Sequence, residues 1–439
     1  MKREIETAYG KISGQEQDHC IVYRGIPYAR PPIGELRWKA PQRMDPWKGV
    51  YEAVEFSAKC PQSENQYGLY GKEFYSSPDF SRRSDEDCLY LNIWTPRSGG
   101  SKKPVAFWIH GGAFAGGYSS EVEFDGEEYC KRGMILITIN YRLNIYGFLA
   151  HPWLNAENEQ SVSGNYGILD QIAALTWVYE NIENFGGDPN NITVFGQSAG
   201  SMSVRALIST ELTGNRISKA ILQSGGGYQT NLLYTPTLKE AEAIGERFAA
   251  YAHATNLEAL RKLSVSELGD ALQKLEEELW NSGNGIVFVP NIDGCLLEDN
   301  VDRLLECGAV KDIPYLLGAV RNDPGSADEQ HANGAYGELL EGCREFSFRL
   351  EELGRNPAYV YHFSHPLPGD DAGAFHSSEL WYMFGTLGRC WRPMEDSDYK
   401  LSEQMIDCWV KFMQTGSLSE DTAEWRPCTK QDAYVREFR

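Results

Sequence analysis

Apolar runs without polar alternation recur along the chain, and segments of helical periodicity separate them. Such runs are typical of strands that are buried on both faces of a parallel sheet. Between them, residues 167–181 repeat apolar side chains at helical spacing, among them Ile168, Ile172 and Leu175. The alternation predicts an α/β fold in which helices flank a mostly parallel twisted sheet. The runs expected to form strands are residues 104–109, 134–139, 192–195, 220–222, 315–317 and 358–361.

Residues 237–279 interrupt this alternation. Two charged amphipathic helical stretches, residues 238–254 and 257–279, follow each other there without a strand between them. We expect a helical cap inserted into a single domain that spans residues 1–439, with an ordinary pair of surface helices as the alternative. No internal repeat, low-complexity segment or linker marks a second domain.

The charge of the chain narrows the range of its partners. There are 41 basic and 62 acidic residues, which gives a formal net charge of −21 at pH 7. Such a surface repels phosphate backbones and anionic membranes, so nucleic acid is not an expected partner. The chain also holds 11 Trp and 24 Tyr, enough to line a pocket as well as fill a core.

The sequence carries no pattern typical of membrane insertion or secretion. No stretch approaches the roughly 18 uninterrupted apolar residues of a spanning helix. The basic pair Lys2 and Arg3 is not followed by an apolar segment, so we expect no signal peptide and a cytoplasmic location. The 10 cysteines include no C-x-x-C spacing, which favours buried thiols over a disulfide scaffold.

A possible nucleophile lies in the segment Gly196-Gln197-Ser198-Ala199-Gly200. It falls between the strand-like run at residues 192–195 and a small-residue helical segment at 199–208. The two glycines leave room for a sharp strand-to-helix turn that presents the Ser198 hydroxyl above the sheet. Taken alone, the motif is explained equally well as a glycine-rich turn with a capping serine.

A second glycine-containing turn supplies candidate donors for an oxyanion. The strand ending at Ile109 runs into His110-Gly111-Gly112-Ala113-Phe114. Small residues at this point let backbone N–H groups turn toward a developing negative charge. The motif resembles the H-G-G-G type of esterases, with Ala113 where a third glycine is usual. Two such motifs at strand ends, in this order, favour acyl transfer by Ser198.

Downstream histidines offer a general base. His376 lies in a loop after the last predicted strand, where an imidazole can reach the edge of the sheet. His362 falls inside a strand-like run and His365 precedes a proline. We therefore expect His376 to be the base and the other two to be structural.

Asp323 is the first candidate for the acid that orients this base. It closes the turn just beyond the strand at residues 313–317, where catalytic groups collect in such sheets. An ordinary capping Asp before Pro324 is the alternative interpretation of that residue. Asp328 and Glu329 are fallback candidates, but they lie in a polar stretch without a strand to anchor them.

Three segments together resemble the type-B carboxylesterase/lipase family. Residues 185–200 match the family's nucleophile signature, residues 86–96 its second signature, and residues 24–38 its N-terminal segment. The C-terminal half agrees at Asp323, at His376 with Glu379, and at residues 409–416. The resemblance implies an α/β-hydrolase fold and serine esterase activity, without a metal or an organic cofactor.

The resemblance also implies roles for individual residues. Ser198 takes the position of the nucleophile and His376 that of the base, while Asp323 takes the acid position, which in much of the family is Glu. The shorter side chain of Asp323 requires a small shift of the backbone. The N–H groups of Gly112, Ala113 and Ala199 take the positions of the oxyanion hole.

The chain departs from the family pattern in three places. Only 53 positions separate Asp323 from His376, which implies a trimmed lid over the pocket. Cys60 and Cys88 match a pair that is disulfide-bonded in secreted relatives, and the sequence leaves that bond open. The loop between them holds five aromatic residues but no Trp, so choline esters are not expected. These are Tyr67, Tyr70, Phe74, Tyr75 and Phe80.

We therefore expect a carboxylic ester hydrolase that works through an acyl-enzyme on small to medium esters. The sequence leaves the acyl and alcohol preference open, aromatic acyl esters among the alternatives. A triad hydrolase of an amide, thioester, carbamate or lactone is the alternative, and a non-catalytic binding module is a more distant one. Four aromatic residues are candidates for pocket walls, with simple core packing as the alternative for each. They are Phe114, Tyr118, Trp381 and Phe384.

Overall fold

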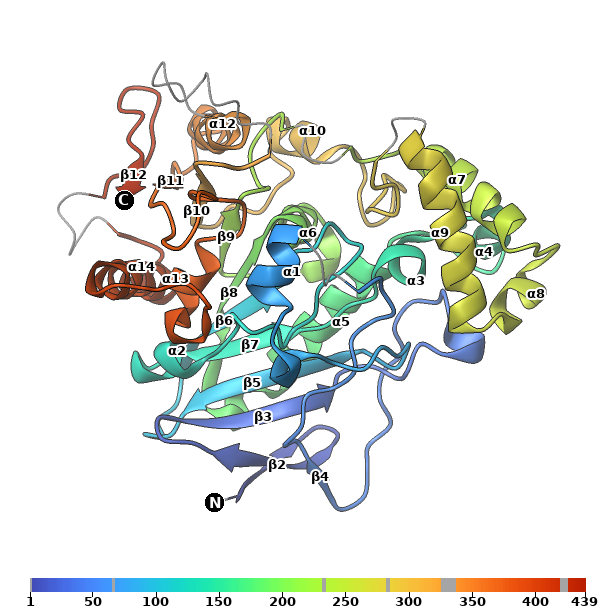
Figure 1. Ribbon diagram of the computed structural model, residues 1–439, viewed down its shortest axis with the longest axis horizontal. Coiled ribbons are helices and arrows are strands. Elements are labelled where there is room, and N and C mark those ends of the chain that lie inside the picture. The colour runs from blue at the N-terminus through green and yellow to red at the C-terminus, as the bar shows by residue number, and fades with distance from the viewer. Residues whose placement is uncertain (1, 65–67, 231–233, 282–284, 325–336, 419–424) are drawn as a thin grey trace.

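The computed structural model describes residues 2–64, 68–230, 234–281, 285–324, 337–418 and 425–439. Within these ranges, twelve strands form one sheet in the order β1-β2-β3-β5-β7-β6-β8-β9-β10-β11-β12, with β4 paired to β2 (Figure 1). The strands are β1 (Lys2–Thr7), β2 (Gly10–Glu16), β3 (Cys20–Pro27), β4 (Val50–Glu52), β5 (Tyr90–Pro96), β6 (Lys103–Ile109), β7 (Ile135–Ile139), β8 (Gly187–Gln197), β9 (Lys219–Gln223), β10 (Tyr315–Val320), β11 (Tyr359–Phe363) and β12 (Arg436–Phe438).

The sheet is parallel from β7 to β12 and antiparallel at its N-terminal edge. Strand β6 pairs in parallel with β7 and β8, and the parallel pairing continues through β9, β10, β11 and β12. Strands β3 and β5 add antiparallel pairs. The six predicted strands are β6 to β11, so the expected α/β fold with a mostly parallel sheet is confirmed. Parallel strands end at a common edge, and loops at that edge bring distant residues together.

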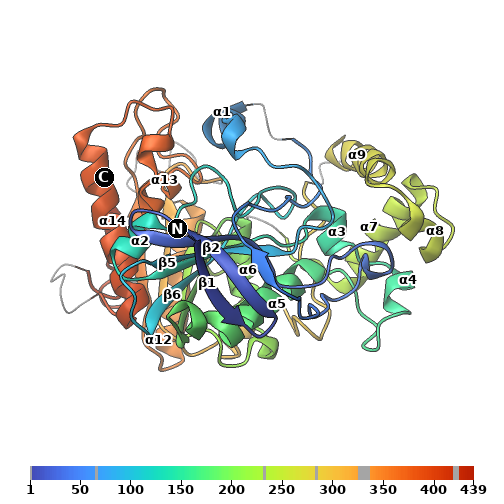
Figure 2. The same cartoon turned by 90° about the horizontal axis from the view of Figure 1, so that it is seen from below.

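Side chains of the central strands alternate between two separate cores. In β6, Val105, Phe107 and Ile109 belong to one buried cluster, whereas Ala106 and Trp108 belong to the other. Helices α5, α6 and α12 cover the first face, and α2, α13 and α14 cover the second, where Figure 2 shows them together at one side of the sheet. Their bounds are α2 (Glu127–Lys131), α5 (Tyr166–Asn181), α6 (Ala199–Ile208), α12 (Glu338–Glu352), α13 (Leu380–Phe384) and α14 (Asp396–Thr415).

The helical region between β9 and β10 contains α7 (Leu238–Tyr251), α8 (Leu257–Lys262) and α9 (Val265–Asn281). The expected stretch at 257–279 is broken because Ser264 begins a new helix. The N–H of Glu267 donates to the Ser264 hydroxyl (3.2 Å), and the N–H of Ser264 donates to the Glu267 carboxylate (2.8 Å). This is a reciprocal capping box. In both views, α7, α8 and α9 lie at the far end of the molecule from α14 (Figures 1 and 2).

Short helices complete the described fold. They are α1 (Gly68–Phe74), α3 (Asn144–Phe148), α4 (Pro152–Asn155) and α10 (Val301–Glu306), with 3₁₀ turns at Gly34–Leu36, Pro78–Phe80, Ile182–Phe185, Glu211–Thr213 and Leu387–Arg389.

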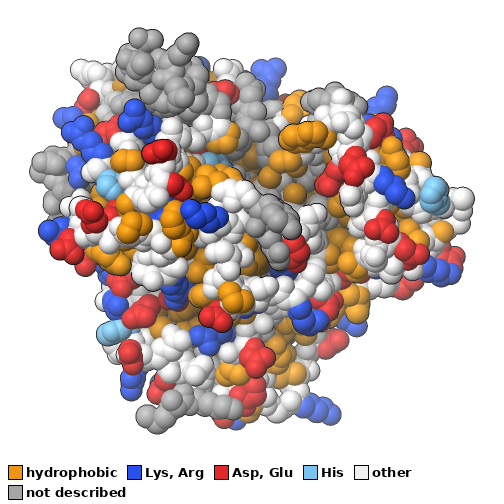
Figure 3. Space-filling view, in the orientation of Figure 1, with side chains coloured by type: hydrophobic (Ala, Val, Ile, Leu, Met, Phe, Trp, Pro, Cys, Tyr) orange, Lys and Arg blue, Asp and Glu red, His pale blue; other side chains and the backbone are white. Residues whose placement is uncertain are grey.

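Acidic and basic side chains are interspersed over the face of the molecule that Figure 3 shows. Among the helices that the structure describes, none has both the length and the apolar character needed to cross a membrane. All ten cysteines are free thiols, Cys60 and Cys88 among them. These two lie buried within hydrogen-bonding contact of each other.

Candidate active site

Ser198 occupies a strained turn between β8 and α6. Its backbone has φ 55° and ψ −124°, a combination that L-residues rarely adopt. The N–H of Ser198 donates to the carbonyl of Gln223 on the neighbouring strand (2.9 Å), which fixes the turn to the sheet. A side chain at Gly200 would collide with the carbonyl of Ile109, and one at Gly196 would collide with Gly200. The two flanking glycines are therefore required by the close approach of β6, β8 and α6.

The turn after β6 lies directly against Ser198. Gly112 and Ala113 both have positive φ, 98° and 57°, and a Cβ placed on Gly111 would lie 3.2 Å from the Cβ of Ser198. Among the described residues, the structure gives no hydrogen-bond partner to the N–H groups of Gly112, Ala113 and Ala199. Ala199 is the first residue of helix α6, and the first N–H groups of a helix lack partners within it. These three amides are thus available to an anion at this end of the sheet.

His376 and Asp323 meet at the same edge, after β11 and β10. The Nδ1 atom of His376 lies 2.5 Å from Oδ1 of Asp323. The other carboxylate oxygen of Asp323 accepts hydrogen bonds from the Ser224 hydroxyl and from the N–H of Val320, both at 2.8 Å. Asp323 is only 4% exposed. Three donors therefore hold a buried carboxylate in a fixed orientation toward the imidazole.

Two loops supply these residues, and a backbone link joins the loops. Asn322, next to Asp323, forms an isolated parallel bridge with Phe375, next to His376. The link places the acid and the imidazole in register, although 53 positions separate them in the sequence. The fallback candidates Asp328 and Glu329 lie outside the described residues.

The electrostatics of His376 reflect its burial and its partner. Burial lowers the pKa of this imidazole, but the hydrogen bond and the negative charge of Asp323 outweigh burial, so the pKa is raised above the usual histidine value. The other ring nitrogen, Nε2, lies 3.2 Å from the side-chain amide nitrogen of Gln197. Because Nδ1 faces a carboxylate, the neutral ring carries its proton on Nδ1 and presents a lone pair at Nε2.

Glu379 lies buried behind His376 and Asp323. Its carboxyl group accepts a hydrogen bond from the Gln223 side chain at 3.4 Å. Burial, together with the charge of Asp323, raises the pKa of Glu379 to about 8. The raised pKa favours the protonated form of Glu379 and so disfavours a second negative charge beside His376.

Ser198, His376, Gly112 and Ala113 line one cavity of about 610 Å³. Asp323 lies behind the imidazole, and its neighbour Pro324 reaches the cavity wall. Helix α1 contributes the aromatic side chains of Tyr70 and Phe74, and α9 contributes Leu272 and Glu276. The structure thus brings the predicted nucleophile, base and acid together with two of the three predicted oxyanion donors at one cavity.

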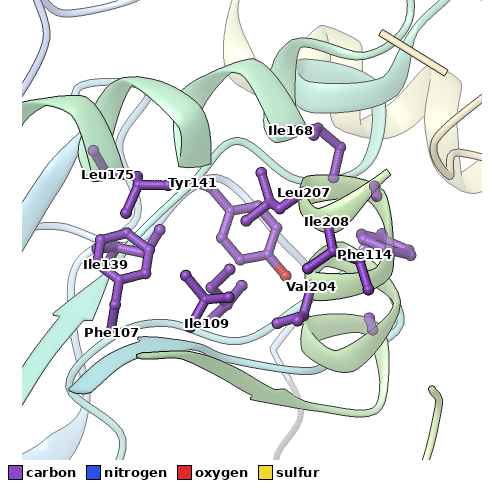
Figure 4. Packing of buried hydrophobic residues seen from close by; sticks show 14 of the residues in the cluster. Phe107, Ile109, Phe114, Ile139, Tyr141, Ile168, Leu175, Val204, Leu207 and Ile208 are labelled. Atoms are coloured by element: carbon purple, nitrogen blue, oxygen red, sulfur yellow. The ribbon is translucent and has the colours of Figure 1, made fainter. Parts of the chain in front are cut away.

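The four aromatic residues predicted as pocket walls are not among the described residues that line this cavity. Phe114 is fully buried in the core, where Figure 4 shows it beside Val204 and Ile208. Phe384 packs edge-on against Trp108 in the other core, with 5.1 Å between ring centroids. Core packing, which was the alternative, describes both of these side chains.

Tyr118 and Trp381 are held behind the wall by their polar atoms. The Tyr118 hydroxyl donates to the carbonyl of Phe80 (2.9 Å), and the Trp381 indole N–H donates to the buried carboxylate of Glu73 (2.8 Å). The ring of Trp381 stacks on Phe74, with 5.4 Å between centroids. Trp381 therefore supports a residue of the wall without reaching the cavity itself.

The other two downstream histidines have structural partners. His362 lies in β11, and its Nδ1 is 3.0 Å from the Glu437 carboxylate. His365 lies 2.8 Å from Asp398 at the start of α14. In the described part of the chain, no group of three or more His, Cys, Asp or Glu side chains is placed to hold a metal ion.

Sequence reasoning missed two acidic residues of the cavity wall, Glu121 and Glu123. Both are buried, at 5% and 2% exposure, and both line the cavity beside Ser198. The only signal in the sequence is their spacing at alternate positions after the turn that follows β6. That spacing is ordinary for a surface loop, so burial was not evident.

Comparison with known proteins decides the family. The model of the carboxylesterase family matches residues 1–338 and 342–438. The chain belongs to the carboxylesterase family. It is 31% identical to the para-nitrobenzyl esterase of Bacillus subtilis (strain 168) over 464 residues, which cover 96% of this chain and 91% of that protein. It is 33% identical to the fumonisin B1 esterase of Sphingopyxis macrogoltabida, over 98% of this chain and 85% of that one.

The fold of this carboxylesterase agrees with that assignment. A solved structure of a PNB esterase superposes with a TM-score of 0.86 at 28% identity, and the match covers 100% of this chain and 96% of the other. The carboxylesterase is thus an α/β-hydrolase that hydrolyses carboxylic esters, as the resemblance in the sequence implied.

Proposed function

We propose that Ser198, His376 and Asp323 form the catalytic triad of this carboxylesterase. The observation that carries the proposal is the contact between His376 Nδ1 and Asp323 Oδ1 at 2.5 Å, beside a cavity that Ser198 and His376 both line. This contact fixes the tautomer that leaves Nε2 free to accept a proton.

In acylation, the Ser198 oxygen attacks the ester carbonyl carbon while Nε2 of His376 takes the hydroxyl proton. The Ser198 hydroxyl replaces the Gln197 amide at that nitrogen when substrate binds. The imidazolium then gives its proton to the departing alcohol, and the carbon–oxygen bond to that alcohol breaks. Water repeats the sequence on the acyl-enzyme: His376 takes its proton, the acid is released, and Ser198 regains its hydroxyl.

The oxyanion of each tetrahedral intermediate is bound by the N–H groups of Gly112, Ala113 and Ala199. Their positions are set by the local backbone, in which Gly112 and Ala113 have positive φ and Ala199 is the first residue of α6. Donors that are oriented before the reaction stabilise the developing charge without reorganisation, and each is typically worth about 10²–10³ in rate.

The substrate is a small to medium carboxylic ester, which suits a cavity of about 610 Å³. Leu272 and Glu276 reach this cavity from α9, which supports the interpretation of residues 237–279 as a cap-like insertion within a single domain of residues 1–439. The ten free thiols support a reducing compartment such as the cytoplasm.

A pair of serine variants tests the proposal. Ser198→Ala is expected to lower kcat for a short p-nitrophenyl ester by about 10⁴-fold or more. Ser76→Ala is the matched control, since the exposed Ser76 hydroxyl donates to the Lys72 carbonyl and to no other group among the described residues, and it should retain full activity. Undiminished turnover by Ser198→Ala would overturn the assignment of the nucleophile.

A further inference from the structure

Glu121 and Glu123 place two carboxyl groups in contact within the wall of the active-site cavity. Both line the cavity that holds Ser198 and His376, and their side chains lie within hydrogen-bonding distance of each other. Exposures of 5% and 2% mean that bulk water does not solvate them. Two carboxylates in such contact cannot both ionise, so they share a proton.

The hydrogen bonds of the pair are incomplete. Oε1 of Glu121 accepts from the Tyr75 hydroxyl (2.8 Å) and from the N–H of Tyr118 (3.1 Å). Apart from the contact with Glu121, Oε2 of Glu123 is buried with no hydrogen-bond partner among the described residues. A buried carboxyl oxygen without a donor is costly, so such atoms are normally satisfied by protein, water or ligand.

The cations near the pair are engaged elsewhere. The ammonium of Lys59 binds Glu64 at 3.0 Å, and the Arg82 side chain donates to the Ser120 hydroxyl at 3.0 Å. The charge of Glu73 also raises the pKa of Glu123, but Glu73 is itself paired with Arg392 at 3.0 Å. No arginine, lysine or histidine among the described residues therefore neutralises the pair by direct contact.

The charge state of the pair follows from these surroundings. Burial raises the pKa of Glu121 to about 7, against the opposing hydrogen bonds of Tyr75, Glu123 and the Tyr118 amide and the charge of Lys59. Burial and the charge of Glu121 raise the pKa of Glu123 well above its usual range. Once Glu121 ionises, the pair therefore holds one proton and one negative charge.

Aromatic side chains line the cavity around these carboxyl groups. Phe74, Tyr75 and Phe124 contribute to the wall together with Glu121 and Glu123. A carboxylate with a free acceptor, next to aromatic rings and without a protein cation, matches an ammonium group. The N–H donates to the oxygen, and the charge interacts with the ring faces. A neutral alkyl group supplies neither interaction.

We propose that Glu121 and Glu123 form a subsite that binds a protonated amine carried by the ester substrate. The subsite rests on the proposed esterase site at Ser198, because it selects among the substrates of that site. It favours esters with an amino group on the acyl or the alcohol side over esters of the same shape with carbon in place of nitrogen.

Two pairs of isosteric esters test the subsite on the intact protein. On the alcohol side, 2-(dimethylamino)ethyl acetate is compared with 3-methylbutyl acetate. On the acyl side, ethyl 3-(dimethylamino)propanoate is compared with ethyl 4-methylpentanoate. Hydrolysis is followed by acid release slightly above neutral pH. We expect kcat/KM to be about tenfold or more higher for the amine in at least one pair, which is the effect of one charge-assisted hydrogen bond.

The double variant Glu121→Gln/Glu123→Gln removes the charge and keeps the shape, and its two amides can still bond to each other. The ratio of kcat/KM between amine and carbon ester should fall to about one in this variant. Glu403→Gln makes the same type of change at an exposed site on α14, and should keep the wild-type ratio.

Two results would overturn the subsite. One is a ratio of one or below in both pairs with the wild-type protein, which decides the matter even where the double variant does not fold. The other is a preference for the amine that survives in the folded double variant. Failure of the esterase site itself is distinct, because then Ser198→Ala would leave hydrolysis of the carbon esters unchanged.

Discussion

Asn322 and Ala374 exchange two hydrogen bonds between the loops that carry the proposed acid and base. The N–H of Asn322 donates to the carbonyl of Ala374 (2.9 Å), and the N–H of Ala374 donates to the side-chain oxygen of Asn322 (3.0 Å). Asp323 follows Asn322 directly, and His376 lies two residues after Ala374. This link therefore sets the distance between the acid and the imidazole, so Asn322 is a positioning residue.

Replacing Asn322 with Ala removes the side-chain half of this link. We expect kcat for a p-nitrophenyl ester to fall by about 10-fold to 100-fold, because small displacements of a catalytic pair are costly, while KM changes little. Asp371→Ala, an exposed change in the same loop as His376, is the control and should leave kcat intact. A change confined to KM would show that Asn322 acts on binding and not on the alignment of the pair.

The raised pKa of His376 predicts the acid limb of the pH profile. In the proposed triad, His376 must be neutral to accept the Ser198 proton. We therefore expect kcat/KM to fall as the pH drops through this pKa, above the usual value of 6.5. In Asp323→Asn the hydrogen bond to a carboxylate and its charge are lost. The limb should then move to lower pH while kcat falls by about 10⁴-fold. If the acid limb of the Asp323→Asn variant stays at the wild-type pH, a group other than His376 causes it.

The raised pKa of Glu379 predicts that the stability of the folded protein depends on pH. Its pKa is about 8 in the folded protein and near 4.5 when unfolded, so between these values the folded state holds a proton that unfolding releases. Stability is favoured at low pH and is lost as the pH rises from about 4.5 toward 8. Glu379→Gln, which mimics the protonated form, should lose less stability than the wild type over this range in thermal unfolding. Equal slopes for the two proteins would contradict a protonated Glu379.

Replacement by Ala should change the free energy of unfolding in opposite directions at Gly200 and at Gly269. A Cβ at Gly200 collides with the Ile109 carbonyl, whereas a Cβ at Gly269 in α9 meets nothing within 4 Å. We expect Gly200→Ala to lower the free energy of unfolding by about 3 kcal/mol or more. Gly269→Ala should raise it by about 0.5–1 kcal/mol, since Ala favours the helix. Urea denaturation measures both, and a stable Gly200→Ala would disprove the tight packing of the turn.

Local pattern was enough to predict the centre of the fold. Six apolar runs became β6 to β11, and the small-residue segment after Ser198 became α6. The spacing of apolar residues and the glycines at 196 and 200 specify these elements. Both signals can be identified within a short segment of sequence. The single helix expected at 257–279 was wrong because the capping box of Ser264 and Glu267 starts a new helix there, and this local signal outweighs the apolar spacing.

The residues that line the pocket were harder to predict from the sequence, because burial depends on contacts between distant segments. Phe114 directly follows Ala113, and Phe384 lies in the segment that follows His376, yet both side chains pack in the cores. Tyr70 and Phe74, from a loop noted only for its aromatic content, reach the cavity through α1. The contact between Glu121 and Glu123 required the backbone path after β6, which no motif describes.

The residue that a fluorophosphonate modifies covalently shows most directly whether Ser198 is the nucleophile. Such reagents react with an activated serine and form a stable phosphonyl-enzyme. After treatment and digestion, mass spectrometry of the peptides should find one adduct per chain, on Ser198, and labelling should be strongly slowed in His376→Ala. An adduct on a different residue, or an unlabelled protein that still hydrolyses esters, would contradict the assignment of Ser198 as the nucleophile.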